Sequence, residues 1–325
     1  MSNAPLIHAL QSVRAACELV RNVQAELVSE DVVAKADRSP VTVADLSAQA
    51  VISSMLGVHF PHIPLLAEED DESFRDDPEL AERILRHVAA VLGPEHAVDA
   101  LEAIKRGRHP GGAGQFWVLD PIDGTEGFLR NDQYAVCLAL LDRGQVQLAV
   151  LGCPNLPLFP GRTDSPRGVL AVAARGEGAS IESLDGSVRA PCRVSQVAHS
   201  AEATLIESLV GDHTDHGRQQ SIAAVLGLER APLRMDSQAK FVAVARGEAD
   251  LYLRFSGAAD FKQKIWDIAA GALLVEEAGG QVSDAQGRPL DFTLGRDLGL
   301  AELYATNGLL HAQVRDAIQK TREQS

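Results

Sequence analysis

The chain contains one dense stretch, Trp117-Val-Leu-Asp-Pro-Ile-Asp-Gly-Thr-Glu-Gly-Phe128, from which both its fold and its chemistry can be approached. The apolar start predicts a buried strand that ends at Asp120. Asp123 follows three residues later, after a proline that turns the chain. The two carboxylates and the Ile122 carbonyl are then expected to face one point. Oxygen ligands of this kind suit hard cations such as Mg²⁺.

A helix is expected to begin directly after this pair, at Gly124 and Thr125. The free N–H groups of a helix start and the positive end of its dipole favour a phosphate. The alternative is that Asp120 and Asp123 only cap a turn and a helix. Because both carboxylates follow an apolar strand, the cation site is the favoured interpretation.

A second acidic segment ends another apolar run. Residues 63–67 predict a short buried strand, and Glu68 follows at its end. A solvated acidic loop is the usual explanation for such a run of charges. If the two strand ends meet, however, Glu68 adds a third carboxylate to the Asp120 and Asp123 pair.

Two more carboxylates lie at expected helix starts. Asp267 precedes an apolar run, so it is either a helix cap or a further metal ligand with a helix dipole behind it. Asp45 stands three residues after Thr42, which is the spacing of a capping box. The alternative role for Asp45 is a carboxylate that binds a metal or activates water.

The composition narrows the function classes. The 325 residues include 30 Lys plus Arg and 45 Asp plus Glu, a net charge of −15. A phosphate backbone rewards a net basic surface, so this balance argues against binding to a nucleic-acid polymer. No apolar run approaches the roughly 20 residues of a membrane helix, and residues 1–10 lack the pattern of a secretory signal. Four scattered cysteines without CxxC spacing favour free thiols and a cytoplasmic protein.

Alternating apolar strands and helices favour an α/β class. Apolar spacing predicts an opening helix that carries its apolar face from Ile7 to Val20 and ends before Ser29, and another helix after Pro78. Further helices are predicted at residues 42–56, 218–227, 238–246, 266–278 and 309–320. Segments 134–141 and 145–151 predict a hairpin around a short turn. Residues 153–167 contain four prolines and predict the boundary between a first lobe, 1–160, and a second, 161–325.

Together these positions resemble the inositol monophosphatase superfamily of lithium-sensitive, metal-dependent phosphomonoesterases. Within it, the chain is most similar to the 3′(2′),5′-bisphosphate nucleotidases. The similarity runs from about residue 35 to residue 282. Its blocks are Ser39 to Asp45, Glu68-Glu69, Asp120 to Tyr134, Gly152 to Pro157, Asp236 to Lys240, Asp250 to Arg254 and Lys264 to Asp267.

The resemblance implies a fold and a set of roles. The fold is α/β (α+β), a layered αβαβα sandwich of the inositol monophosphatase and fructose-1,6-bisphosphatase type, with the site between its lobes. The implied ligands of two or three Mg²⁺ ions are Glu68, Asp120, the Ile122 carbonyl, Asp123 and Asp267. Asp45 and Thr125 are implied to orient and deprotonate the attacking water. The implied substrate contacts are Thr125, His216, Ser237, Lys240, Arg254 and Asp267.

The second-lobe positions suit a second anionic group on the substrate. Lys240 stands three residues after Ser237, so both can share one helix face. Arg254 ends an expected strand and can bracket a phosphate with two N–H donors. The alternative for each is an ordinary surface cation or hydroxyl. His213 and His216 share a polar loop that either meets the substrate or is simply exposed.

The implied reaction removes the 3′-phosphate of adenosine 3′,5′-bisphosphate to give AMP and phosphate, with 3′-phosphoadenylyl sulfate as a second substrate. The rivals are an inositol (poly)phosphate 1-phosphatase, a non-catalytic nucleotide-binding protein and a structural acidic protein. The expected partner is a small phosphorylated nucleotide, without a nucleic-acid polymer or a membrane, and the chain is expected to be a monomer or homodimer. Glu126 departs from the family pattern, in which lysine is common, and adds an anion beside the site.

Overall fold

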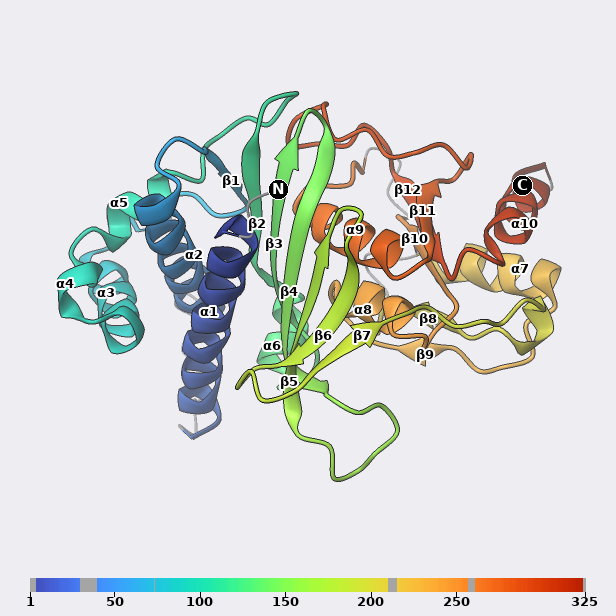
Figure 1. Ribbon diagram of the computed structural model, residues 1–325, viewed down its shortest axis with the longest axis horizontal. Helices are drawn as coiled ribbons and strands as arrows, with labels where there is room; N and C mark the ends of the chain where they lie inside the picture. The colour runs from blue at the N-terminus through green and yellow to red at the C-terminus, as the bar shows by residue number, and fades with distance from the viewer. Residues whose placement is uncertain (1–3, 30–39, 73, 210–214, 257–260, 324–325) are drawn as a thin grey trace.

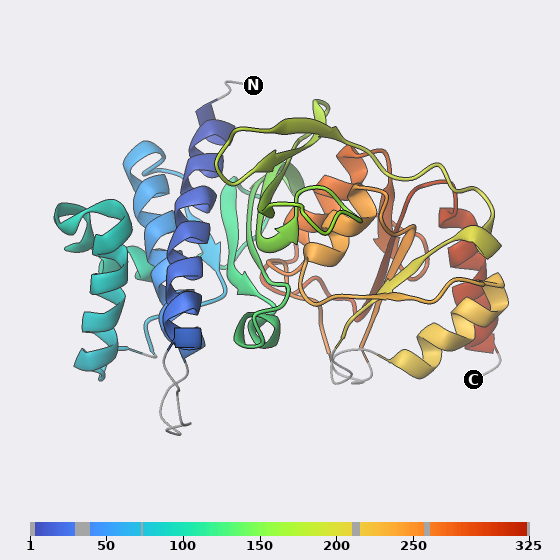
Figure 2. The same cartoon turned by 90° about the horizontal axis from the view of Figure 1, so that it is seen from below.

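The computed structural model describes residues 4–29, 40–72, 74–209, 215–256 and 261–323. Its elements stack as five layers, in the order helix, sheet, helix, sheet, helix, from left to right in Figure 1. The view from below in Figure 2 shows the same succession. The predicted αβαβα sandwich is therefore confirmed.

The first layer consists of two long helices, α1 (Ala4–Ser29) and α2 (Pro40–His59). Outside them lie α3 (Pro78–Leu92), α4 (Pro94–Ala97) and α5 (Ala100–Lys105). Helix α3 begins with a proline behind Asp77, whose carboxylate accepts a hydrogen bond from the Leu80 N–H at 3.0 Å. The apolar faces of α1 and α2 form one core with the adjacent sheet, through residues such as Val13 and Ile52.

The second layer is a seven-stranded sheet in simple chain order. Its strands are β1 (Leu65–Ala67), β2 (Phe116–Asp123), β3 (Ala135–Asp142), β4 (Gln145–Pro157), β5 (Arg167–Ala174), β6 (Gly178–Ser183) and β7 (Arg189–Cys192). The β1 and β2 strands run parallel, and all later neighbours pair antiparallel. The short helix α6 (Thr125–Leu129) follows β2 directly. The β3–β4 hairpin confirms the predicted one.

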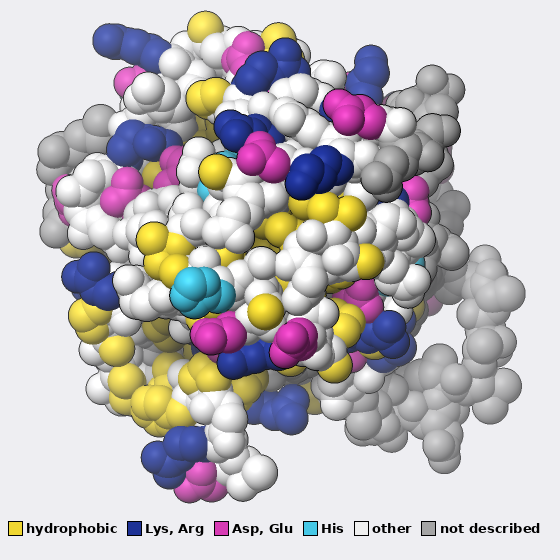
Figure 3. Space-filling model, turned by 90° about the vertical axis from the view of Figure 1, so that its right-hand side faces the viewer, with side chains coloured by type: hydrophobic (Ala, Val, Ile, Leu, Met, Phe, Trp, Pro, Cys, Tyr) yellow, Lys and Arg dark blue, Asp and Glu magenta, His cyan; other side chains and the backbone are white. Residues whose placement is uncertain are grey.

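The remaining layers follow the seven-stranded sheet. Helices α8 (Ala239–Ala245) and α9 (Ala269–Glu277) lie between it and a five-stranded sheet ordered β11-β12-β10-β8-β9. Those strands are β8 (Leu205–Glu207), β9 (Leu233–Arg234), β10 (Leu251–Phe255), β11 (Gln281–Asp284) and β12 (Glu302–Thr306). Helices α7 (His216–Leu226) and α10 (His311–Glu323) cover its outer face, where basic and acidic side chains are interspersed (Figure 3). A short 3₁₀ turn, Ser200–Glu202, precedes β8.

The predicted helices are all present, although several ends differ. The helix predicted from residue 266 begins at Ala269, because the Ile268 backbone is still outside the helical region at φ −127°. The predicted lobe boundary at residue 160 lies between β4 and β5, inside one sheet. The chain reaches the second sheet only after Cys192. The division into lobes 1–160 and 161–325 stays a prediction.

Two further observations concern the chain as a whole. All four cysteines are buried and unpaired, as the spacing predicted. In the parts of the chain that the structure describes, no helix combines the length and the apolarity needed to cross a bilayer.

A buried histidine ties helix α10 to the second sheet. The His311 ring contacts the Ser283 hydroxyl at 2.8 Å and the Thr306 hydroxyl at 3.0 Å, and it stacks on Tyr304 at 4.3 Å. Burial, with a contribution from Arg315, lowers the pKa of His311 to about 4. The ring is therefore neutral at neutral pH.

This arrangement predicts a pH-dependent stability. The unfolded histidine, with a pKa near 6.5, binds its proton before the folded one does. The stabilisation is therefore complete above pH 6.5, and we expect about 2 kcal/mol of it to be lost between pH 6.5 and 4, after allowance for solvent screening. The measurement is urea unfolding of the wild type and His311→Phe across this range. A pH-independent difference between the two would contradict the prediction.

Candidate active site

The carboxyl ends of β1 and β2 meet, as required for a joint role of their acidic residues. The parallel register pairs Ala67 with Leu119, and the Glu68 N–H donates to the Leu119 carbonyl at 3.1 Å. Glu68 and Asp120 are therefore the next residues on neighbouring strands, and the charge of Glu68 acts on Asp120. The prediction that these two acidic residues come together is confirmed.

A β-bulge brings Asp123 to the same face as Asp120. The antiparallel partner of Asp120 is Cys137, whereas that of Asp123 is Ala135, so three steps on β2 match two on β3. Cys137 and Ala135 lie on one face of β3, and their partners therefore do as well. The bulge contains Pro121, which has no N–H to contribute to the ladder. The sequence thus folds locally so that both carboxylates point to one side.

Asp267 joins this cluster from the start of α9. One of its carboxylate oxygens accepts a hydrogen bond from the Arg254 guanidinium at 2.6 Å. The charge of Asp267 also acts on both Glu68 and Asp120. Four acidic side chains, from β2, from the residue after β1 and from the segment just before α9, therefore lie within electrostatic reach of one another.

The electrostatics of this cluster are unfavourable without a counter-charge. Asp120 is fully enclosed, and burial followed by the charges of Glu68 and Asp123 raises its pKa well above the ordinary value. Glu68 is exposed and lines the adjacent cavity. Burial and then the charge of Asp267 raise the pKa of Glu68. Both shifts show how strongly this cluster favours a positive partner.

The acidic residues have the oxygen atoms that a hard cation needs, although some of these oxygens already accept hydrogen bonds from the protein. The Oδ1 atom of Asp120 is buried and has no hydrogen-bond partner, which is a costly state for a carboxylate oxygen. Among the described residues, no three acidic, histidine or cysteine side chains already converge as a ligand set. Protein donors hold some of the oxygens instead, with Arg254 on Asp267 and the Gln238 N–H on Asp123 at 2.7 Å. The side chains that could bind the cation are nevertheless all carboxylates, which are ligands that Mg²⁺ prefers.

Asp45 lies on α2 with its side chain buried, at 5 % exposure. Burial, followed by the charges of Glu69 and Glu68, raises its pKa well above the ordinary value. The residue is therefore close to the acidic cluster although it is separated from it by more than 20 positions in the chain. Thr125 is exposed at the first position of α6. A direct relay between Asp45 and Thr125 stays a prediction.

A cavity of about 310 Å³ opens beside the cluster. It collects residues from both sheets and from the loops before α8 and α9. Of the predicted site residues, it is lined by Glu68, Asp123, Thr125, Ser237, Lys240, Arg254 and Asp267. The fold therefore brings most of the predicted polar residues to a single cavity.

Lys240 supplies a buried cation to this cavity. Its side chain is 2 % exposed, donates to the Met235 carbonyl at 3.2 Å and lies over the Tyr252 ring at 5.3 Å. Within the described residues, no carboxylate forms an ion pair with it. A buried ammonium group without an acidic partner is a strong attractor for an anion.

Gly124, directly after β2, lies against Ser237, two residues before α8. Gly124 has a φ of 89°, and a Cβ atom built on it would lie 2.8 Å from the Ser237 Cβ. Ser237 itself adopts a positive φ of 66°. Glycine at position 124 is thus required both by its backbone and by its neighbour.

Glu126 carries its own counter-charge. Its carboxylate pairs with Arg130 at 3.2 Å on the exposed side of α6, and Arg130 also pairs with Asp236 across the cavity edge. Asp236 in turn accepts a hydrogen bond from the Leu209 N–H at 3.2 Å. The anion at position 126 is therefore partly neutralised and helps to connect α6 with the second sheet.

Four predicted site residues do not line the cavity, and they are Asp45, Asp120, Ile122 and His216. His216 begins α7, and its ring faces Glu207 at 3.6 Å. The neighbour of Glu207, Ser208, does line the cavity, so His216 lies one step behind the wall. Its contact with substrate stays a prediction. His213, like Ser39, falls outside the described residues.

Some lining residues were not predicted from the sequence. They are Glu126 as a lining residue, Ser208, Asp236, Tyr252, Phe261 and Gln263. Gln263 is buried and accepts from the Arg254 Nε–H at 2.5 Å, so it orients the guanidinium. Gln238, inside the block from Asp236 to Lys240, was likewise passed over. Gln263 stands between Lys262 and Lys264, whereas Gln238 stands between Ser237 and Ala239 and has no charged neighbour in the sequence.

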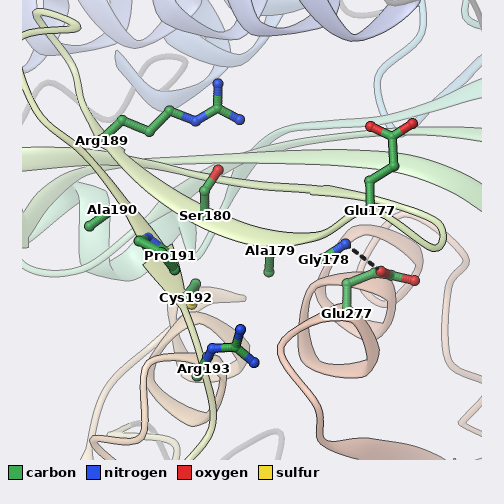
Figure 4. A pocket seen from close by; sticks show the side chains of 10 residues that line it. All are labelled: Glu177, Gly178, Ala179, Ser180, Arg189, Ala190, Pro191, Cys192, Arg193 and Glu277. Atoms are coloured by element: carbon green, nitrogen blue, oxygen red, sulfur yellow. Dashed lines mark hydrogen bonds between the residues drawn. The ribbon is translucent and has the colours of Figure 1, made fainter.

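Two other hollows lie away from this chemistry. One, at the β6–β7 edge, has a volume of about 310 Å³ and is lined by residues such as Arg189, Arg193 and Glu277 (Figure 4). There the Glu277 carboxylate accepts hydrogen bonds from Gly176 and Gly178 at 2.8 and 2.9 Å, so it closes the β5–β6 turn. A groove of about 730 Å³ lies among α2, α3 and α5. Neither contains a predicted site residue.

Comparisons with known proteins show the family to which the chain belongs. The model of the inositol monophosphatase family matches residues 3–321. The chain is 41% identical over 308 residues to a 3′(2′),5′-bisphosphate nucleotidase of Schizosaccharomyces pombe, covering 89% of this chain and 87% of that protein. It is 42% identical over 338 aligned positions to the nucleotidase of the same name from Oryza sativa, covering 97% and 94%. An IMPase structure from Thermotoga maritima superposes with a TM-score of 0.65 at 20% identity, covering 99% of each chain. By family match, by relatives and by fold, this chain belongs to the inositol monophosphatase family.

Proposed function

We propose that this chain is a metal-dependent 3′(2′),5′-bisphosphate nucleotidase. It removes the 3′-phosphate of adenosine 3′,5′-bisphosphate to give AMP and phosphate. Two relatives that match at 41% and 42% identity carry the name of this activity and are covered almost completely. The phosphatase chemistry itself is that of the family to which the chain belongs.

The buried Lys240 is the observation that carries the choice of substrate. With its cations bound, the acidic cluster at the end of β2 would bind one phosphate. The same cavity also has a cationic wall with Lys240 and Arg254, which would bind a second anionic group. A substrate with two anionic groups matches both walls. An inositol monophosphate would leave the buried ammonium group without a partner, which costs free energy.

The residues that would hold two or three Mg²⁺ ions are Glu68, Asp120, the Ile122 carbonyl, Asp123 and Asp267. The unpartnered Oδ1 of Asp120 supports this assignment. Bound Mg²⁺ would supply positive charge that offsets both the clustered carboxylates and the roughly two negative charges of a phosphate monoester. Asp267 would serve on both sides, because it lines the cavity and holds Arg254 in place.

Asp45 and Thr125 would act on the attacking water. A raised pKa makes the Asp45 carboxylate a stronger base than an ordinary aspartate, as removal of a proton from water requires. Thr125 would orient the water with its hydroxyl at the start of α6. The N–H groups of this helix start and the Ser237 hydroxyl would then bind phosphate oxygens. His216 would reach the nucleotide from behind Glu207.

Phosphate release across a substrate panel tests this proposal. We expect turnover of adenosine 3′,5′-bisphosphate and of 3′-phosphoadenylyl sulfate with Mg²⁺, and background rates after chelation. A higher kcat/KM on inositol 1-phosphate or inositol 1,4-bisphosphate would reverse the choice of substrate. Phosphate release from none of these compounds would leave a nucleotide-binding protein instead.

Removal of the metal predicts a change in stability as well as in activity. Mg²⁺ at about 100 times its dissociation constant should stabilise the folded chain by about 2.7 kcal/mol, because it binds the native cluster only. Asp120→Asn should melt at a higher temperature than the wild type without Mg²⁺, since one buried charge is gone, and should lose most of the Mg²⁺-dependent shift. The measurement is a thermal melt with and without Mg²⁺. An equal shift in both proteins would remove Asp120 from the ligand set.

The setting of the enzyme is also part of the proposal. Its partner is a small phosphorylated nucleotide of sulfur metabolism, and its state is a monomer or a homodimer. A cytoplasmic location is supported by four free, buried thiols, which persist in reducing compartments. We retain a division into lobes 1–160 and 161–325, with the cavity drawing residues from both.

A further inference from the structure

Gln238 occupies the junction between the acidic cluster and the cationic wall of the cavity. It is the residue before α8, it lies between Ser237 and the rest of that helix, and its side chain is 1 % exposed. A fully buried amide carries one acceptor and one donor group that must both be satisfied. Its partners therefore show what this residue holds together.

The backbone of Gln238 reaches the end of β2. Its N–H donates to the Asp123 Oδ2 atom at 2.7 Å, which joins the second sheet region to the bulge of the first. The contact occupies one carboxylate oxygen and so sets how the other is directed. The close approach of Gly124 to Ser237 beside it leaves little room for the loop to shift.

The side chain of Gln238 reaches the start of α9. Its Nε2 group donates to the Trp266 carbonyl at 2.9 Å, and its Oε1 atom accepts from the Gly271 N–H at 3.1 Å. Gly271 lies in the first turn of α9, whose N-cap residue, Ile268, provides no side-chain cap. Gln238 therefore caps this helix from outside. The segment that it fixes is the one that carries Asp267.

One residue thus connects two carboxylates that come from distant parts of the chain. The Gln238 backbone holds Asp123. The Gln238 side chain holds the segment on both sides of Asp267, at Trp266 and at Gly271. The partners of metal ligands orient them, and their loss typically weakens metal affinity or activity by a factor of roughly 10 to 100.

We propose that Gln238 is a positioning residue that sets the separation of Asp123 and Asp267 for cation binding. The inference rests on the proposed function only in that the acidic cluster holds cations. It adds a residue that would touch neither metal nor substrate through its side chain. It also predicts that the cation-binding and nucleotide-binding walls move together, because Ser237 and Lys240 flank this anchor.

The test compares Gln238→Met with Gln219→Met. Methionine keeps the length of the side chain and removes both hydrogen bonds. Gln219, on α7, is a matched control. It is as fully buried as Gln238, and its side chain donates to the Leu253 backbone carbonyl at 2.6 Å. The readout is Mn²⁺ affinity of the full chain, measured by electron paramagnetic resonance without substrate, together with the melting temperature.

We expect Gln238→Met to bind Mn²⁺ about 10 to 100 times more weakly, and Gln219→Met to bind it as the wild type does. Excess Mg²⁺ should restore much of the phosphate release of Gln238→Met at a temperature at which the metal-free variant is still folded, so that weaker cation binding is separated from loss of the fold. If Gln238→Met does not fold, Gln238→Asn, which stays polar but is one methylene shorter, gives the same comparison. Unchanged Mn²⁺ affinity in the folded variant, or an equal loss in Gln219→Met, overturns the proposal.

The outcome separates this inference from the proposed function. A wild type that binds Mn²⁺ and hydrolyses the nucleotide, with Gln238→Met unaffected, sinks only the role of Gln238. A wild type that binds Mn²⁺ but releases no phosphate from any nucleotide contradicts the proposed function, while a weaker affinity in Gln238→Met still supports the positioning role.

Discussion

Asp45→Asn is expected to lower the rate of phosphate release by a factor of about 10²–10⁴, the range that a positioned general base contributes. Asparagine has the same shape but cannot accept a proton from water. The raised pKa of Asp45, which arises from burial and then from Glu69 and Glu68, is the reason that this position suits the task. The measurement is kcat at saturating Mg²⁺ and adenosine 3′,5′-bisphosphate.

The fold should survive this change. A buried carboxylate near two other acidic side chains is unfavourable, so the neutral amide should give a melting temperature equal to or above that of the wild type. An inactive variant with an intact melt supports a chemical role for Asp45. Phosphate release at a near-normal rate would remove Asp45 from the mechanism and leave it as a buried residue of α2.

Lys240→Met should act on the second phosphate alone. A hydrogen bond to a charged group contributes about 1.5–3 kcal/mol, so kcat/KM for adenosine 3′,5′-bisphosphate should fall about 10- to 150-fold. For 3′-AMP, which lacks the 5′-phosphate, the same substitution should cost only a few-fold. The methionine side chain keeps the contact with the Tyr252 ring but not the charge.

The control for this experiment is Lys320→Met on α10, an exposed lysine outside the cavity. It removes the same charge from the molecule and should leave both substrates unaffected. An equal loss on both substrates in Lys240→Met would mean that Lys240 supports the cavity wall and does not select the second phosphate.

The meeting of Glu68 with Asp120 could be predicted because it depends on local pattern. Each residue ends an apolar run, and buried strands of a layered fold tend to end at a common edge. The same logic placed Asp267 at a helix start. These predictions need only the order of elements, and the chain supplies strong apolar periodicity for each of them.

The partners inside the site could not be predicted in this way. The pairing of Arg254 with Asp267, the burial of Lys240 and the hydrogen bonds of Gln238 depend on how α8, α9 and β10 pack together, which no local spacing encodes. The proximity of Asp45 to Glu69 likewise depends on α2 crossing the end of β1. The ring of His216 likewise faces Glu207 through the packing of α7 on the second sheet, a contact that the polar loop did not indicate.

The bulge on β2 has a consequence for how this site tolerates insertions and deletions. An ordinary strand alternates its side chains, so two residues three positions apart would be separated by the thickness of the sheet. Asp120 and Asp123 share a face only because the β-bulge adds one residue to β2 between them. Deleting one residue between them would place them two positions apart, and a regular strand without the bulge would then hold both on one face. The present spacing in a regular strand would instead turn one carboxylate into the α1–α2 core. The chemistry of this chain thus depends on a local break in the alternation of side chains along β2, and the presence of both aspartates alone does not guarantee it.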